Sequence, residues 1–136
     1  MDKSGNSLLM LIPTKIILSK LLISLRLHPS DYGWDHHQRW RDIYPNIKIG
    51  KPGIKIEKLI RSSRLYISTY NATTYLESMT WNIPTIIFWN PKHWELKEDV
   101  RPLFESLKTV GIFHDSPASA ARQVMLIWDS VSEWWE

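Results

Sequence analysis

Apolar residues along the chain gather in short runs, which are separated by polar turns and by segments with helical spacing. The runs at 65–67 and 85–89 are rich in β-branched and aromatic residues, which is typical of buried strands. Between them lie a small polar turn and a short amphipathic segment, and Pro84 cannot continue that helix. Residues 64–90 therefore predict a strand–helix–strand unit with parallel strands and a right-handed connection.

The flanking sequence continues this alternation. Further short strands are predicted at 21–27, 46–49 and 112–113. Capping residues, prolines and glycines bound amphipathic patterns that predict helices at 35–45, 56–60, 99–111 and 116–131. In the first of these helices His37, Trp40 and Tyr44 share a face, which is expected to pack in the core. The pattern predicts one α/β domain over 21–136, with a short, mostly parallel, Rossmann-like sheet flanked by helices.

The first 20 residues form a separate segment in this scheme. We expect residues 1–20 to be an N-terminal extension that is partly disordered or helical. The apolar stretch at 8–25 contains Pro13 and two lysines, and the longest uncharged run, at 4–14, is shorter than the roughly 20 residues that span a bilayer. Membrane association is therefore not expected.

Composition and charge narrow the function classes. Cysteine is absent, which excludes disulfides and thiolate chemistry and favours a reducing cytoplasm. The five histidines lack ligand-like spacing and no Asp-x-Asp pair occurs, so no metal site is expected. Nine Lys and Arg face four Asp and Glu between Arg26 and Arg64. These basic residues form no continuous stripe with aromatic residues, so nucleic-acid binding is not expected. They either attract a small phosphate-bearing ligand or are simply solvated.

The clearest candidate chemistry lies at the start of the helix after 65–67. Backbone N–H groups at Ala72, Thr73 and Thr74 would stand at an open helix N-terminus beside two hydroxyls, which suits a phosphate. Glu77 follows about one helical turn later, where its carboxylate can accept hydrogen bonds from ribose hydroxyls. The same residues also fit plain capping, in which Asn71 or Thr73 caps the helix and Glu77 completes a capping box.

A resemblance to a known family rests on the segment TYNATTYLESMTWNIPTIIFWN, with RLHPSDYGW upstream and VGIFHDSPASAA downstream. Together these segments resemble a bacterial family of transferases from surface-carbohydrate gene clusters. That family is distantly similar to glycosyltransferases of the B type (GT-B), and the resemblance runs from about Leu25 to the C-terminus. It implies the C-terminal half of a GT-B fold, which holds the nucleotide-linked donor. It also implies a fragment whose N-terminal acceptor domain is missing or separate.

The resemblance implies roles for several residues. In GT-B enzymes a small-residue turn at this place meets the donor phosphates and a helix glutamate meets the ribose. These roles fall here on Thr73, Thr74 and Glu77, with Asn71 in the same turn, although the glycine pair that many GT-B enzymes carry there is absent. The last GT-B helix commonly crosses back to the N-terminal domain, so the Trp134–Trp135 pair is expected to anchor it.

Two loops at strand ends add further candidates. His28 and Pro29 follow the first strand, at the edge where open α/β sheets bind ligands. This pair resembles a motif that bacterial sialyltransferases use against CMP, which implies a CMP- or CDP-linked donor and a phosphate contact for His28; local packing against a backbone carbonyl is the alternative. Asn90, His93 and Trp94 follow the second strand of the central unit, where they either contact the donor sugar or form an aromatic loop that covers the sheet edge.

The resulting hypothesis is the donor-binding half of a GT-B-like transferase. It would move a nucleotide-activated sugar in cell-surface polysaccharide biosynthesis, in the cytoplasm or peripheral to the inner membrane, with the donor as substrate and no cofactor. His28 is the one catalytic candidate, and no general base is assigned, so activity requires a separate acceptor domain. The alternatives are a non-catalytic nucleotide-binding module and an inactive truncated remnant. The hypothesis requires His28, Thr73, Thr74 and Glu77 to line one crevice at the carboxyl edge of the sheet.

Overall fold

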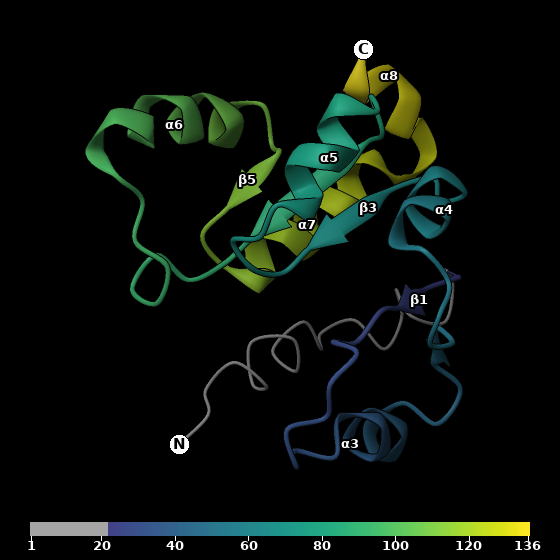
Figure 1. Cartoon of the computed structure of the whole chain (residues 1–136). Coiled ribbons are helices and arrows are strands. Elements are labelled where there is room, and N and C mark those ends of the chain that lie inside the picture. Colours follow the sequence, from purple (N-terminus) through teal and green to yellow (C-terminus); the bar gives the residue numbers. More distant parts are fainter. Residues whose placement is uncertain (1–21) are drawn as a thin grey trace.

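The computed structural model describes residues 22–136 (Figure 1). Strands and helices alternate along these residues, and each of their strand pairs is parallel. The predicted α/β class with a Rossmann-like arrangement of parallel strands is therefore confirmed. The predicted N-terminal extension at 1–20 lies outside the described residues.

The larger sheet has the strand order β3-β4-β5. Its central strand β4 (Thr85–Phe88) lies between β3 (Tyr66–Ser68) and β5 (Phe113–His114). A second sheet consists of β1 (Ser24–Leu25) and β2 (Lys48–Ile49). The sequence predicts a single sheet, but no ladder between residues 22 and 136 joins the two. The strand predicted at 21–27 covers only two residues in β1, and so short a strand forms few ladder hydrogen bonds.

The helices differ in length and burial. They are α3 (His36–Ile43), α4 (Ile56–Arg61), α5 (Thr74–Thr80), α6 (Arg101–Thr109), α7 (Pro117–Ile127) and α8 (Val131–Trp135), with 3-10 turns η1 (Glu98–Val100) and η2 (Trp128–Ser130) leading into α6 and α8. The start of α7 is as predicted, because the Ser116 hydroxyl accepts the Ser119 N–H at 3.2 Å and Pro117 is the first helical residue. None of these helices is long and apolar enough to cross a bilayer.

Strand β4 is the centre of the core because helices cover both of its faces. Ile86 and Phe88 pack in a cluster with residues of α7 and α8. Ile87 points to the opposite face and packs in a cluster with Tyr75 of α5 and Phe104 of α6. The sequence of a parallel strand that is buried on both faces is typically a continuous run of apolar residues. This is why the segment TIIFW predicts β4 correctly from the sequence.

The two C-terminal tryptophans make hydrogen bonds within this domain. Trp134 packs against the cluster that contains Val131, and its indole N–H donates to the Val110 carbonyl at 3.0 Å. The Trp135 indole N–H donates to Oδ1 of Asn82 at 2.9 Å. Both indole donors are therefore satisfied within the described residues, and the expectation that this pair anchors a crossing helix stays a prediction.

Helix α3 contributes nothing to the buried core. It has no buried residue; His37 is exposed, and the half-buried rings of Trp40 and Tyr44 lie 6.0 Å apart. The expected core stripe on this helix is therefore wrong. Asp35 also makes no side-chain cap. Oδ1 of Asp31 instead accepts three backbone N–H groups just before the helix, which fixes the approach of the chain to α3.

Candidate functional site

The loop after β3 turns tightly before α5 begins. The Ala72 N–H donates to the Tyr70 carbonyl at 3.0 Å, and the Thr73 carbonyl then accepts the Glu77 N–H at 3.2 Å. These bonds place Thr73 and Thr74 at the N-terminal end of α5, just beyond the carboxyl end of β3. Two of the predicted phosphate-binding residues therefore lie at the edge of the sheet where α/β proteins bind ligands.

No side chain caps the start of α5. Thr73 occupies the N-cap position without a side-chain cap hydrogen bond. Oδ1 of Asn71 accepts a hydrogen bond from the Tyr75 hydroxyl at 3.3 Å. Between residues 22 and 136 nothing accepts the N–H groups of Thr73 and Thr74. The capping alternative is therefore wrong, and these donors are open to a ligand.

Glu77 is an exposed carboxylate on the same helix, without an ion pair or side-chain hydrogen bond to any residue that the structure describes. It lies near Tyr66 of β3, whose pKa is raised above 10.0. Burial is the largest cause; the hydrogen bond with Ser68 opposes it, and the charges of Tyr70 and Glu77 add to it. The Tyr66 phenol is therefore protonated at neutral pH. Its role is not predicted from the sequence, although the spacing of Tyr66 and Ser68 places both on one face of β3.

The loop after β4 meets the loop after β3 through two aromatic rings. The Trp94 ring lies 6.4 Å from the ring of Tyr70, and the side chains are 43% and 47% exposed. Asn90 shapes the turn, because its Oδ1 accepts the Lys92 N–H at 3.0 Å and its carbonyl accepts the His93 N–H at 2.9 Å. The aromatic pair therefore joins the two loops and still exposes ring surface. Sugar contacts by Asn90, His93 and Trp94 stay a prediction.

His28 lies in a different part of the molecule. Nδ1 of its ring faces the backbone of Ser30, at 3.2 Å from the N–H and 3.3 Å from the carbonyl oxygen. The ring also borders a small pocket of about 70 Å³ at the carboxyl ends of β1 and β2. This pocket is lined by Arg26, Leu27, His28, Pro29, His37, Gly50, Pro52 and Gly53. The predicted packing against a backbone carbonyl is therefore found for Nδ1 of His28. The ring nevertheless borders the pocket.

The structure therefore brings the predicted residues together in two groups. Asn71, Thr73, Thr74 and Glu77 share the start of α5, and the Tyr70–Trp94 ring pair joins the loop after β4 to them. His28 lies in the loop after β1 of the smaller sheet, and its pocket contains no residue of α5 or of the loop after β3. The predicted single crevice does not appear as one pocket around His28.

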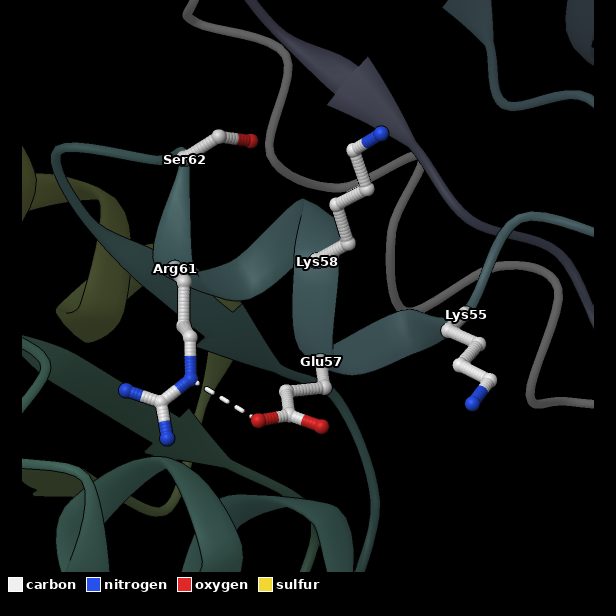
Figure 2. Close-up of a pocket in the computed structure, with 5 residues that line it drawn as sticks. All are labelled: Lys55, Glu57, Lys58, Arg61 and Ser62. Atoms are coloured by element: carbon white, nitrogen blue, oxygen red, sulfur yellow. Dashed lines mark hydrogen bonds and ion pairs between the residues drawn. The ribbon is translucent and has the colours of Figure 1, made fainter.

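A larger hollow of about 370 Å³ lies on α4 (Figure 2). Its lining residues, Lys55, Glu57, Lys58, Arg61 and Ser62, all belong to this helix and its two caps. The Arg61–Glu57 ion pair, at 2.9 Å, is half-exposed, and such pairs contribute only a few tenths of a kcal/mol. The hollow is thus a basic helix surface without a second wall, and it contains no predicted site residue.

His114 is a buried histidine with a structural role. Its Nε2 lies 2.9 Å from the Gly111 carbonyl and its Nδ1 lies 2.7 Å from the Ser119 hydroxyl. Because a carbonyl only accepts, Nε2 carries the proton, and burial lowers the pKa of His114 below 6.5. The neutral ring therefore ties β5 to α7. In the described range no group of three or more His, Asp or Glu is placed to hold a metal ion.

Comparison with known proteins assigns a family to this arrangement. A family model described as "LIC12162 family transferase" matches residues 17–136, which is most of the chain. No curated protein and no solved structure matches the chain. The family match covers both sheets and every candidate site residue.

Proposed function

Because the chain belongs to the LIC12162 family of transferases, we propose that it binds a nucleotide-activated sugar as the donor-binding part of an enzyme of cell-surface polysaccharide biosynthesis. The observation that carries the proposal is the uncapped start of α5, where open N–H groups and a free carboxylate stand about one helical turn apart. A nucleoside phosphate matches both, since its phosphate accepts hydrogen bonds and its ribose hydroxyls donate them.

The phosphate of the donor would bind at Thr73 and Thr74. Their backbone N–H groups are open and their hydroxyls can rotate toward an anion. When the sugar leaves, negative charge grows on the departing phosphate, and fixed donors hold the charged product better than the intact donor. Removing one such donor from an enzyme typically lowers kcat by about 10²–10³-fold. His28 is proposed as a further phosphate contact, and its His-Pro context favours a CMP- or CDP-linked donor.

The sugar of the donor would lie toward the loop after β4. The exposed ring surfaces of Tyr70 and Trp94 suit stacking on the apolar face of a sugar ring, and Asn90 and His93 offer polar groups beside them. In this scheme all the candidate polar residues at the carboxyl edge of the sheet bind the donor. We therefore assign the acceptor and its general base to a separate domain or polypeptide.

Calorimetry with CMP, CDP, UDP and GDP tests the proposal on the full chain. Glu77→Gln keeps the size of the side chain but removes its charge. We expect it to weaken binding of the preferred nucleotide about tenfold or more, because a charged hydrogen bond contributes roughly 1.5–3 kcal/mol. His93→Ala should have the smaller effect, since a sugar contact is absent in a free nucleotide.

Glu133→Gln is the matched control. Glu133 is also an exposed carboxylate in the first turn of a helix, but it belongs to α8. It should leave nucleotide affinity unchanged. Absence of binding for all four nucleotides, or equal affinities of the Glu77→Gln and Glu133→Gln variants, would contradict the proposal.

A further inference from the structure

The loop that joins β1 to α3 (Figure 1) carries a row of aromatic rings, which ends on the first residue of α3. Neighbouring ring centres lie 5.4 Å apart from His28 to Tyr32, 5.9 Å from Tyr32 to Trp34 and 5.3 Å from Trp34 to His36. Tyr32 is 64% exposed and Trp34 is 49% exposed, and neither belongs to a core cluster of the described residues. Core packing therefore does not account for these four rings, which we call the aromatic row.

The backbone beneath the aromatic row is held in a defined conformation. Oδ1 of Asp31 accepts the N–H groups of Gly33, Trp34 and Asp35 at 3.0, 3.0 and 3.2 Å. Gly33 and Asp35, which separate the rings at 32, 34 and 36, have φ values of +81° and +48°. Glycine and aspartate adopt this left-handed conformation more readily than most residues. The rings are thus positioned before any ligand arrives, which reduces the entropy that binding costs.

The polar groups beside the rings favour a ligand without negative charge. Residues 28–36 include Asp31 and Asp35 but no lysine or arginine. In the described part of the chain neither carboxylate forms an ion pair, and Oδ2 of Asp31 has no hydrogen-bond partner. Carboxylates accept hydrogen bonds from hydroxyl groups and repel phosphates. A polyhydroxyl ligand therefore fits this surface better than a nucleic acid or an anionic membrane.

The spacing of the rings favours a saccharide chain over a cation. Neighbouring rings are tilted by 26° to 52° and contact each other, so no ammonium group fits between two of them, as it does in an aromatic cage. Their centres follow one another at 5.3–5.9 Å, which is close to the length of one pyranose unit in an extended saccharide. The apolar face of a pyranose can stack on a ring while its hydroxyls donate to the carboxylates.

We infer that the aromatic row binds a saccharide chain, with Tyr32 and Trp34 as its main contacts. In a transferase of polysaccharide biosynthesis this chain is a part of the acceptor that lies away from the reacting end, and that assignment rests on the proposed function. Saccharide binding by the loop does not depend on it. The reacting hydroxyl and its general base stay with the separate domain.

A glycan array followed by calorimetry tests the inference. The full chain, with a fluorescent label at its N-terminus, is applied to neutral oligosaccharides built from hexoses, deoxyhexoses and N-acetylhexosamines. The oligosaccharide that binds best is then titrated. Tyr32→Ala/Trp34→Ala should weaken its binding about tenfold or more, because two aromatic stacking contacts are lost. Trp34→Phe keeps a smaller ring in the row and should lose less affinity than the double variant.

Met125→Ala/Leu126→Ala is the matched control. Both side chains are exposed, at 60% and 78%, but they belong to α7. This variant should leave saccharide affinity unchanged. Urea unfolding should give similar stabilities for all variants, because each exchanged side chain is largely exposed. Should Tyr32→Ala/Trp34→Ala be less stable, Trp34→Phe decides the case: affinity below that of the control supports the inference, and affinity equal to it contradicts the inference.

Two results would overturn the inference. One is that no oligosaccharide of the array binds; the other is that the Tyr32→Ala/Trp34→Ala variant binds as tightly as the α7 control. Calorimetry with CDP on the same samples tests the proposed function separately. Because neither Tyr32 nor Trp34 is a proposed nucleotide contact, CDP affinity should be the same in the double variant and the parent chain. Saccharide binding and nucleotide binding can therefore fail independently.

Discussion

Replacing Thr85 with valine is expected to weaken the contact between α5 and β4. Ser78 and Thr85 are both 0% exposed, and their hydroxyl oxygens lie 2.9 Å apart. The Thr85 hydroxyl also donates to the Ile83 carbonyl at 2.7 Å, and the Ser78 hydroxyl donates to the Tyr75 carbonyl at 2.8 Å. Valine has nearly the shape of threonine, so the substitution removes hydrogen bonds without opening a cavity.

The expected loss of stability follows from the number of hydroxyl hydrogens that Ser78 and Thr85 can donate. Two hydroxyls supply two hydrogens for three contacts, and the hydrogen that Thr85 gives to Ile83 cannot also serve Ser78. In Thr85→Val the Ile83 carbonyl loses its donor, while Ser78 keeps its bond to Tyr75. We expect a loss of about 1–2 kcal/mol in the free energy of unfolding, from one net hydrogen bond and a partly desolvated carbonyl. Ser78→Ala should cost about 0.5–1 kcal/mol, because Thr85 still satisfies the Ile83 carbonyl.

Urea unfolding followed by tryptophan fluorescence measures these differences. Thr109→Val is the matched control, because the Thr109 hydroxyl makes a comparable bond to the Glu105 carbonyl at 3.0 Å but on the exposed side of α6. The control should stay within about 0.5 kcal/mol of the parent chain. A Thr85→Val variant that is as stable as the Thr109→Val variant would refute the reasoning about the buried pair.

Two further stability predictions concern the segment that follows α6. Gly111→Ala should cost about 1–2 kcal/mol, because φ is +77°. The new Cβ would lie 2.6 Å from Nε2 of Gln123, but the end of this flexible side chain can rotate away, so Gly53→Ala, with φ +87° and open space, should cost a similar amount. A much larger loss for Gly111→Ala in urea unfolding would contradict the assignment to φ strain. Stability should also decrease as the pH falls below 6.5, because burial lowers the pKa of His114 in the folded state and the unfolded chain takes up the proton first. His114→Gln should flatten this decrease, and an unchanged slope would contradict the assignment.

The central unit of the fold is predictable because its signals are local. The runs at 65–67 and 85–89 become β3 and β4 within a residue or two, since apolar β-formers bounded by polar turns leave few alternatives. Asn82 ends α5 with φ at 54°, a conformation that asparagine tolerates. The positions of Thr73, Thr74 and Glu77 at the strand end follow from the same local pattern.

Contacts between distant segments are not predictable in this way. The indole of Trp135 bonds to Asn82, which is 53 residues away, and no periodicity in either segment reports that contact. The amphipathic pattern of α3 fits a buried helix, but the structure has no neighbour that buries it. The grouping of Tyr66 with Glu77 likewise depends on how α5 packs on β3. Hydrophobic periodicity identifies a face that can be buried, but it does not identify the partner.

Few interactions fix the position of the smaller sheet relative to the larger one in the described part of the chain. Within the described residues no hydrogen bond joins 22–63 to 65–136. One contact across this boundary comes from α4, where the guanidinium of Arg61 lies 4.8 Å from the Trp81 ring. A segment with so few anchoring contacts belongs to the least stable part of a fold, and such parts move with a ligand. A ligand that contacted both segments would add interactions across this boundary, so its binding would stabilise their relative placement.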